Sequence, residues 1–489
     1  MAGTVRISRL TSAGAVAICT LLAVLGMVLL QGESQGLGAR TSGPSNPYDI
    51  TGVDQRVFFS ANDGTHGTEL WVSNGTRLGT HLVRDIEPGA AWSDPGSLIN
   101  FGGTPFFAAH NDAHGWALWR SNGPRQRTFV LKDIFVDGMA HAGGKLFLGA
   151  AGPFHGFELW ISDGSRAGTR LLKDIWPGPQ WSFPSDLTRI GGRIYFSAGD
   201  AAHGVEPWVS DGTAAGTHQV KDIARGTDGS YPSEFTKVGA VTYFTAEDPV
   251  HGCELWRSDG TGPGTFLLKD IFPGARCPGG VGPGRLSNIG GTLYFVANDG
   301  THGMEPWTSD GTKPGTMIVK DILPGTGWSQ SGDSSVKFTS LGGVAYFTAT
   351  DPAHGCELWK NDGTEPGTTM VKDIYPGKGW SCWSNSLAVM GDHLYFSADD
   401  GVHGVELWKS DGTGAGTHMV RDIHPGRTSS LFGDLTVVDG NLYFSADDGV
   451  HGVELWKSDG SWAGTRLVKD INEATGTGSP TPTSTPSAG

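Results

Sequence analysis

Short apolar runs separated by turn residues fill most of the chain. In residues 184–223 the run "DLTRI" ends at a double glycine, "RIYFSA" ends at an aspartate turn, "VEPWVS" ends at Asp-Gly, and "THQVKDI" completes the stretch. Runs of this length that are rich in β-branched and aromatic residues and are bounded by turns are typical of β-strands. The stretch therefore predicts four antiparallel strands joined by tight turns.

This four-strand unit recurs along the sequence. A His-Gly pair appears nine times, at intervals of 41 to 52 residues, and a tryptophan follows each histidine five residues later. The histidines are His66, His114, His155, His203, His251, His302, His354, His403 and His451. A lone four-stranded sheet cannot bury both of its faces, so repeated sheets of this kind must stack on one another.

We therefore expect an all-β fold, a β-propeller of nine four-stranded blades over residues 47–472. Two smaller propellers or an open β superhelix are the alternatives. The even spacing and the absence of a linker favour one ring. If the strand before the double glycine is innermost, "YDITG" begins blade one and Ile471 ends blade nine; if it is outermost, the N-terminal segment completes the last blade.

The segment Glu406 to Thr413 reads "ELWKSDGT". It resembles the motif of the bacterial ELWxxDGT-repeat proteins, and the resemblance covers nearly all of the chain after its first apolar segment. The repeat is also distantly similar to the WD-repeat blade. The resemblance implies a secreted or surface-located repeat protein, but it names no substrate.

Seven of the nine repeats carry a histidine and two acids that should meet at one edge of the blade. In the eighth repeat these are Asp400, His403 and Asp422. The start of the third strand and the end of the fourth share an edge because the two strands are antiparallel. The three side chains are candidates for a metal site, with Ca²⁺ the plausible ion. Nine near-identical copies favour a hydrogen-bonded turn lock instead, with no cofactor.

Four cysteines occupy matching positions in two repeats. Cys253 and Cys356 each follow a His-Gly pair, and Cys277 and Cys382 each lie beyond the K-D-I-x-P-G segment of the same repeat. Since these two positions meet at one blade edge, we expect the disulfides Cys253–Cys277 and Cys356–Cys382. Disulfides fit an oxidising compartment.

Aromatic residues in the loops after P-G are candidates for a binding surface. They should lie on the same face as the histidines, where exposed rings could stack on a sugar or a protein. The alternative is that each ring packs against the neighbouring blade. The candidates are Trp92, Trp181, Tyr231, Trp328 and Trp380.

The ends of the chain differ in composition from the repeats. Residues 1–36 combine two arginines with a long apolar run and are expected to be an export signal or an uncleaved membrane anchor. Residues 37–46 are expected to be a linker, and the Thr/Ser/Pro-rich residues 473–489 a disordered tail. These features predict a secreted, extracellular or periplasmic protein or one attached to the cell surface.

The formal net charge of -15 argues against nucleic acid as a partner. Residues 47–472 also lack the G-x-S-x-G, H-E-x-x-H and C-x-x-C motifs. We therefore expect a monomeric, non-catalytic scaffold that binds a glycan or a surface protein through loops on one face. The alternatives are a propeller enzyme acting on polysaccharide and a structural surface or matrix component. An enzyme site would be sought where the repeats break, near His141 in the shortened second repeat and near Asp333.

Overall fold

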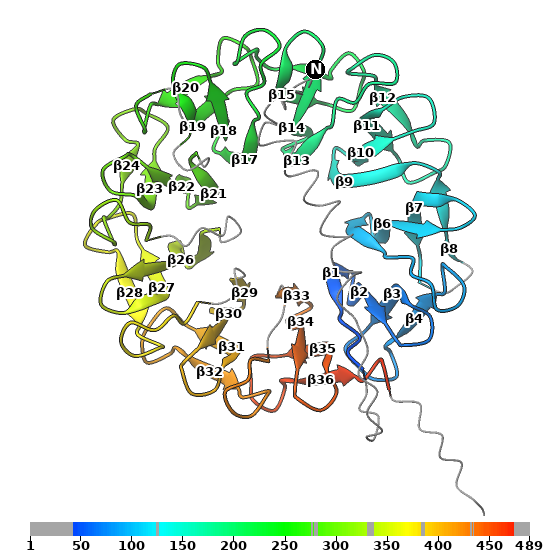
Figure 1. Ribbon diagram of the computed structural model, residues 1–489, viewed down its shortest axis with the longest axis vertical. Coiled ribbons are helices and arrows are strands. Elements are labelled where there is room, and N and C mark those ends of the chain that lie inside the picture. The colour runs from blue at the N-terminus through cyan, green and yellow to red at the C-terminus, as the bar shows by residue number, and fades with distance from the viewer. Residues whose placement is uncertain are drawn as a thin grey trace, which may run out of the picture. The chain divides into compact units, whose positions relative to one another are not determined.

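The computed structural model describes residues 43–473, except 124–126, 275–276, 278–281, 330–336, 383–386, 431–432 and 434. These residues belong to one compact unit, Ser42–Gly489. They contain thirty-six strands in nine four-stranded antiparallel sheets. Figure 1 shows the nine sheets as blades around a ring, which confirms the predicted nine-bladed β-propeller. No helix in the described part of the chain is long and apolar enough to span a membrane.

Each blade consists of four strands that are consecutive in the chain. The first strands are β1 (Tyr48–Val53), β5 (Gly96–Phe101), β9 (Phe135–Ala142), β13 (Ser185–Ile190), β17 (Ser233–Val238), β21 (Gly284–Ile289), β25 (Thr339–Leu341), β29 (Ala388–Met390) and β33 (Thr436–Val438). The second strands are β2 (Arg56–Asn62), β6 (Thr104–Asn111), β10 (Lys145–Ala151), β14 (Arg193–Asp200), β18 (Val241–Asp248), β22 (Thr292–Asn298), β26 (Val344–Asp351), β30 (His393–Asp399) and β34 (Asn441–Asp447). The third strands are β3 (Thr68–Ser73), β7 (Gly115–Ser121), β11 (Phe157–Ser162), β15 (Gly204–Ser210), β19 (Gly252–Ser258), β23 (Met304–Ser309), β27 (Gly355–Asn361), β31 (Val405–Ser410) and β35 (Val453–Ser458). The fourth strands are β4 (His81–Arg84), β8 (Thr128–Lys132), β12 (Arg170–Lys173), β16 (His218–Gln219), β20 (Phe266–Lys269), β24 (Met317–Ile318), β28 (Thr369–Lys372), β32 (His418–Arg421) and β36 (Arg466–Lys469).

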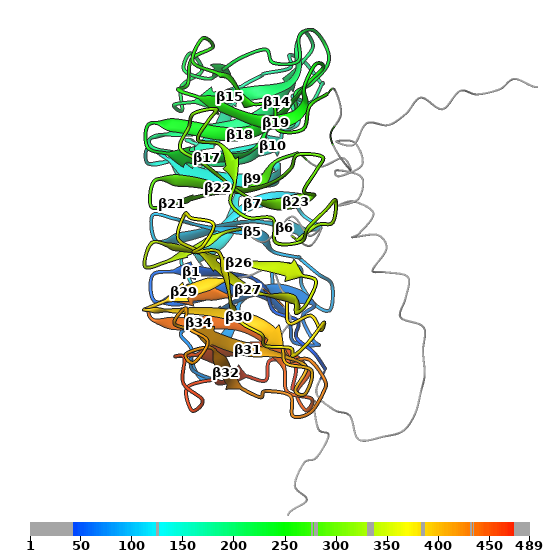
Figure 2. The same cartoon turned by 90° about the vertical axis from the view of Figure 1, so that its left-hand side faces the viewer.

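The first strand of each blade is innermost, and the fourth lies at the outer rim (Figure 1). This settles the frame of the repeat, because blade one starts at β1 and blade nine ends at β36. Figure 2 shows the ring from its edge, with the strand ends on two opposite faces. One face carries the loops between second and third strands and the connections to the next blade. We call it the His face, because the repeated histidines lie in those loops, and we call the opposite face the turn face.

The core is built between neighbouring blades. Along β2, Phe58 packs toward blade two, whereas Val57 and Phe59 pack toward blade nine. Successive side chains of a strand point to opposite faces of its sheet, so a strand that is apolar at consecutive positions needs a neighbour on both sides. Radial stacking of the blades supplies both neighbours for every second strand.

A basic residue at the end of the fourth strand fastens each blade to the next at eight of the nine junctions. Lys173 Nζ, for example, donates to the carbonyl oxygen of Thr217 at 2.7 Å and lies over the ring of Trp208. The eight donors are Arg84, Lys173, Lys221, Lys269, Lys320, Lys372, Arg421 and Lys469. These contacts explain why the residue before the aspartate of K/R-D-I is basic in the repeat.

Two blades have a shortened fourth strand. Pro207 and Pro306 stand where the other seven third strands have leucine. Proline has no N–H to donate to the neighbouring strand, and the adjacent strands β16 and β24 have only two residues each. Both prolines nevertheless lie in third strands that are paired on both sides.

The ring closes without exchanging a strand between its ends. Ser45, which lies in the segment expected to be a linker, donates from its backbone N–H to the carbonyl of Val453 at 3.0 Å and from Oγ to Glu454 Oε2 at 2.7 Å. Lys469 Nζ reaches the carbonyl of Thr80 at 3.2 Å. Hydrophobic residues of blades one and nine form one core cluster across this seam. Side-chain packing and a few hydrogen bonds therefore join the two ends.

We expect Ser45→Ala to loosen the seam specifically. The substitution leaves an acceptor of buried Glu454 without its hydroxyl donor, which should cost about 1–2 kcal/mol of unfolding free energy. Ser430→Ala removes the same bond, Oγ to Glu406 Oε2 at 2.6 Å, inside the continuous chain and is the control. Hydrogen exchange should accelerate in β1 and β35 only in Ser45→Ala. Equal exchange in the two variants would contradict this account of closure.

Candidate functional site

The repeated histidines lie in the loops between second and third strands, on the His face. In seven blades Nδ1 of the histidine contacts the aspartate three residues earlier, as in His403 Nδ1 to Asp400 Oδ2 at 2.7 Å. The same carboxylate accepts the backbone N–H of His403 through Oδ1 at 2.9 Å. The hydrogen bond to Asp400 raises the pKa of His403, and the bonds from His403 help to lower the pKa of Asp400 although burial opposes this. The geometry is that of a turn held by its own side chains.

The third candidate metal ligand, Asp422, does not complete a ligand set with Asp400 and His403. Among the described residues, the only three potential ligands whose atoms lie within 4.8 Å of one another are Glu247, Cys253 and Cys277. Those two cysteines are joined in a disulfide and cannot act as thiolate ligands. The geometry therefore offers no preformed Ca²⁺ cage at the predicted position.

Blades two and three pair their histidines differently. Both blades lack the aspartate three residues before the histidine. There His114 Nδ1 contacts Asp133 Oδ1 at 2.7 Å, and His155 Nδ1 contacts Asp174 Oδ2 at 3.1 Å. Asp133 and Asp174 are the aspartates of the K-D-I segment, so the acid that follows the fourth strand replaces the missing turn acid.

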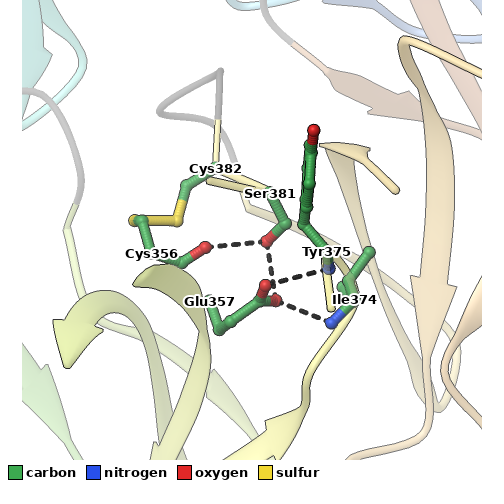
Figure 3. The surroundings of a disulfide bond; sticks show 6 residues. All are labelled: Cys356, Glu357, Ile374, Tyr375, Ser381 and Cys382. Atoms are coloured by element: carbon green, nitrogen blue, oxygen red, sulfur yellow. Dashed lines mark hydrogen bonds between the residues drawn. A yellow bond between two sulfur atoms is a disulfide. The ribbon is translucent and has the colours of Figure 1, made fainter. Parts of the chain in front are cut away.

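A buried glutamate in the third strand holds the connection from each blade to the next. In blade seven, Glu357 accepts the backbone N–H groups of Ile374 and Tyr375 at 3.0 Å each, and the hydroxyl of Ser381 at 2.7 Å (Figure 3). Eight blades have this glutamate. The glutamate of the ELW motif therefore holds the connection between blades in place. Burial raises the pKa of Glu357 to about 7, with a smaller upward effect from the charge of Asp373, against the lowering effect of its hydrogen bonds.

Both predicted disulfides are present, on the His face. Cys253 is bonded to Cys277, and Cys356 to Cys382, with Cα atoms 4.9 and 5.7 Å apart. In Figure 3 the second disulfide lies beside the anchored connection of blade seven. The two disulfides are compatible with an extracellular or periplasmic location.

Blade two lacks both the glutamate and the connection that it would anchor. Ala117 stands in place of the glutamate. Strand β8 ends at Lys132 and β9 begins at Phe135, whereas residues 85–95 separate β4 from β5 in the preceding connection. The long strand β9 therefore reaches the His face without a covering loop.

A chain of aromatic side chains crosses the His face at this break. Ring centroids are 6.3 Å apart for Trp116 and Phe135, 6.2 Å for Phe135 and Phe157, 5.7 Å for Phe157 and Phe183, and 5.0 Å for Phe183 and Trp181. We call these five residues the aromatic ladder. Within the ladder Phe157 is buried, whereas the side chains of the other four residues are 41 to 53% exposed. The exposed rings form two pairs, Trp116 with Phe135 and Phe183 with Trp181, which are joined through Phe157. Exposed aromatic patches are candidate binding surfaces.

All five predicted loop aromatics are at least 38% exposed, so none is fully packed against a neighbouring blade. Only Trp181 belongs to the ladder. Tyr231 is equivalent to Phe183 and not to the tryptophans, because each follows the anchored serine of its connection and has a positive φ, 46° and 48°. The five candidates therefore occupy two different positions in their connections.

Sequence reasoning missed Trp116, Phe135, Phe157 and Phe183. A signal was available, because Trp116 and Phe157 follow His-Gly where other repeats have Thr68 or Val205, and repeat two is the shortest. His141, the polar residue noted at the break, lies in β9 and packs near Phe101. Asp333 lies outside the described residues.

No family model and no curated protein matches the sequence. Solved structures do match. A puromycin hydrolase has 16% identity over 72% of this chain and 58% of its own, with a TM-score of 0.37. A structure from a study of two prolyl endopeptidases has 15% identity over 68% and 49%, with a TM-score of 0.37. The β-propeller domain of the Trilobed protease from Pyrococcus furiosus has 9% identity over 78% and 100%, with a TM-score of 0.35.

These comparisons contradict the expectation of a non-catalytic scaffold for glycans or surface proteins, because the matching structures come from hydrolases and peptidases. That expectation is wrong and is replaced below. The part of each hydrolase or peptidase structure that this chain covers is 49 to 58% of that structure's own length. With TM-scores below 0.5, no residue role or mechanism is transferred from them.

The anchoring glutamates predict a stability that falls as the pH rises. Seven have a pKa raised to about 7, mainly by burial: Glu69, Glu206, Glu254, Glu305, Glu357, Glu406 and Glu454. A raised folded-state pKa means that the folded protein binds more protons than the unfolded chain between pH 4.5 and 7. The contribution is complete below pH 4.5 and is lost as the pH rises through 7.

The urea midpoint of unfolding should therefore be higher at pH 5.5 than at pH 8. Glu357→Gln removes one titrating group and should reduce this difference. The exposed Glu365→Gln, in the turn before β28 of the same blade, should leave it unchanged. A midpoint that increases between pH 5.5 and 8 would contradict the predicted direction.

Proposed function

We propose that this propeller binds extended peptide segments as substrates for hydrolysis and holds them on its His face across the aromatic ladder. The observation that supports the proposal is the ladder itself. Its four exposed rings are joined through a buried fifth and extend from the junction without an anchored connection to the connection after blade three. Aromatic rings offer rigid apolar surface on which aromatic and proline side chains stack. An extended peptide presents every second side chain on one side, so that several such side chains can contact one surface at regular intervals.

The described residues supply recognition and not a complete hydrolytic site. Each histidine of the nine His-Gly pairs directs Nδ1 to an aspartate, as His114 does to Asp133. None of the hydrogen bonds in the described part of the chain joins a histidine ring to a serine, threonine or cysteine side chain, the pairing that activates a nucleophile. The proposal therefore assigns peptide binding, and not bond cleavage, to the described residues.

The proposal includes a location outside the cytoplasm. Two disulfides on the His face and the export-type residues 1–36 support secretion. Because both disulfides lie away from blade two, they can stabilise connections on the His face without covering the ladder.

The repeat itself supplies conservative variants for the test. Trp116→Thr copies Thr68 of blade one, and Phe183→Asn copies Asn46, which has a similar positive φ of 47°. The probe is a dansyl-labelled decapeptide in which phenylalanine alternates with serine. Each lost stacking contact is worth about 0.5–1.5 kcal/mol, so the double variant should bind the peptide about tenfold more weakly in fluorescence titrations.

Tyr231→Asn is the matched control, because Tyr231 occupies the same φ-positive position on another connection and makes no ring contact with the ladder. Its affinity should stay within twofold of the parent protein. Thermal melts establish that each variant is folded. Equal peptide affinity in the parent and the folded double variant, or no binding by the parent, would refute the proposed function.

A further inference from the structure

Carboxylates flank the aromatic ladder. Phe135 and Asp137 are both exposed and flank buried Val136 in β9, where Asp137 is the extra residue of a β-bulge. Asp133 precedes the same strand and is 47% exposed. Asp112 is exposed in the loop that leads to Trp116. The exposed rings at this end of the ladder therefore have acidic groups on both sides along the chain.

Few basic groups offset these acids. Asp133 is shared between His114 at 2.7 Å and Arg166 at 3.7 Å, and Arg166 is 69% exposed. Within the described residues no ion pair involves Asp112 or Asp137. The aromatic rings at this end of the ladder are Trp116 and Phe135, whose electron-rich faces also attract cations. Charge and ring chemistry at the site are thus complementary to a positive side chain beside an apolar one.

We infer that the ladder selects peptides that carry a lysine or arginine next to an aromatic residue. This inference rests on the proposed function and adds the substrate class to it. The aromatic side chain stacks on the exposed rings, and the neighbouring cation lies between Asp137 and the faces of Trp116 and Phe135. A glutamate at the same place in the peptide meets Asp112 and Asp137 and is repelled.

The test uses the full protein and three dansyl-labelled decapeptides that differ at one residue beside a central phenylalanine, which is lysine, glutamine or glutamate. At 50 mM NaCl the lysine peptide should bind at least threefold more tightly than the glutamine peptide, and the glutamate peptide should bind most weakly. Raising NaCl to 500 mM should bring the three affinities together, because the Debye length falls well below that at physiological salt.

Asp137→Asn should reduce the preference for lysine over glutamine to less than twofold and leave the affinity for the glutamine peptide unchanged. Asp392→Asn is the control, since Asp392 is 93% exposed on the turn face of blade eight and its loss changes the net charge equally. An equal loss of preference in both variants would show an effect of net charge alone and would overturn the inference.

Two outcomes separate this inference from the proposed function. If all three peptides bind equally and Trp116→Thr/Phe183→Asn weakens all of them, the ladder binds peptides without charge selection and the inference is wrong. If none of the three binds the parent protein, the proposed function fails and the inference fails with it.

Discussion

Burial of the second strand on both of its sides is the constraint on which the whole molecule depends. A strand such as β34 is buried at five consecutive positions, Leu442 to Ala446, so a single partner sheet cannot cover it. Each fully buried large apolar side chain is worth about 1.5–3 kcal/mol, and nine such strands need neighbours on both sides. A closed ring satisfies all of them, and the seam between β1 and β33 is packed like the other junctions for this reason.

The second level of order is the anchoring of the connections by buried glutamates. Each carboxylate binds backbone N–H groups that would otherwise be unpaired where the chain leaves the fourth strand, as Glu357 does for Ile374 and Tyr375. The same device closes the ring, where Ser45 takes the place of a connection serine. Its absence at Ala117 coincides with the missing connection, and the aromatic ladder occupies the surface exposed there. Function is thus proposed at the position where the structural repeat is broken.

Much of the fold could be predicted from the residues alone. The spacing of the histidines and tryptophans predicted nine blades, and the matching positions of four cysteines predicted both disulfides. The turn-lock interpretation of His403 agrees with its contacts to Asp400. These features depend on local periodicity or on the antiparallel pairing of neighbouring strands, both of which are visible in one repeat. The role of the glutamate was missed, because its partners lie 17 to 24 residues away in a loop without regular structure.

Less of the candidate site could be predicted from the sequence, again because its residues are far apart in the chain. Trp116 belongs to the third strand of blade two, whereas Phe135 and Phe183 belong to the first strand of blade three and to the connection that follows it, and no periodicity relates them. The sequence by itself determined the unit, its number and its turns, because these follow from short-range patterns of apolar residues and glycine. Only the tertiary structure decided which strand faces the ring centre, how the two ends meet and which aromatic residues share a surface. Those outcomes depend on how neighbouring blades stack, and side chains from separate blades come together only when the ring is formed.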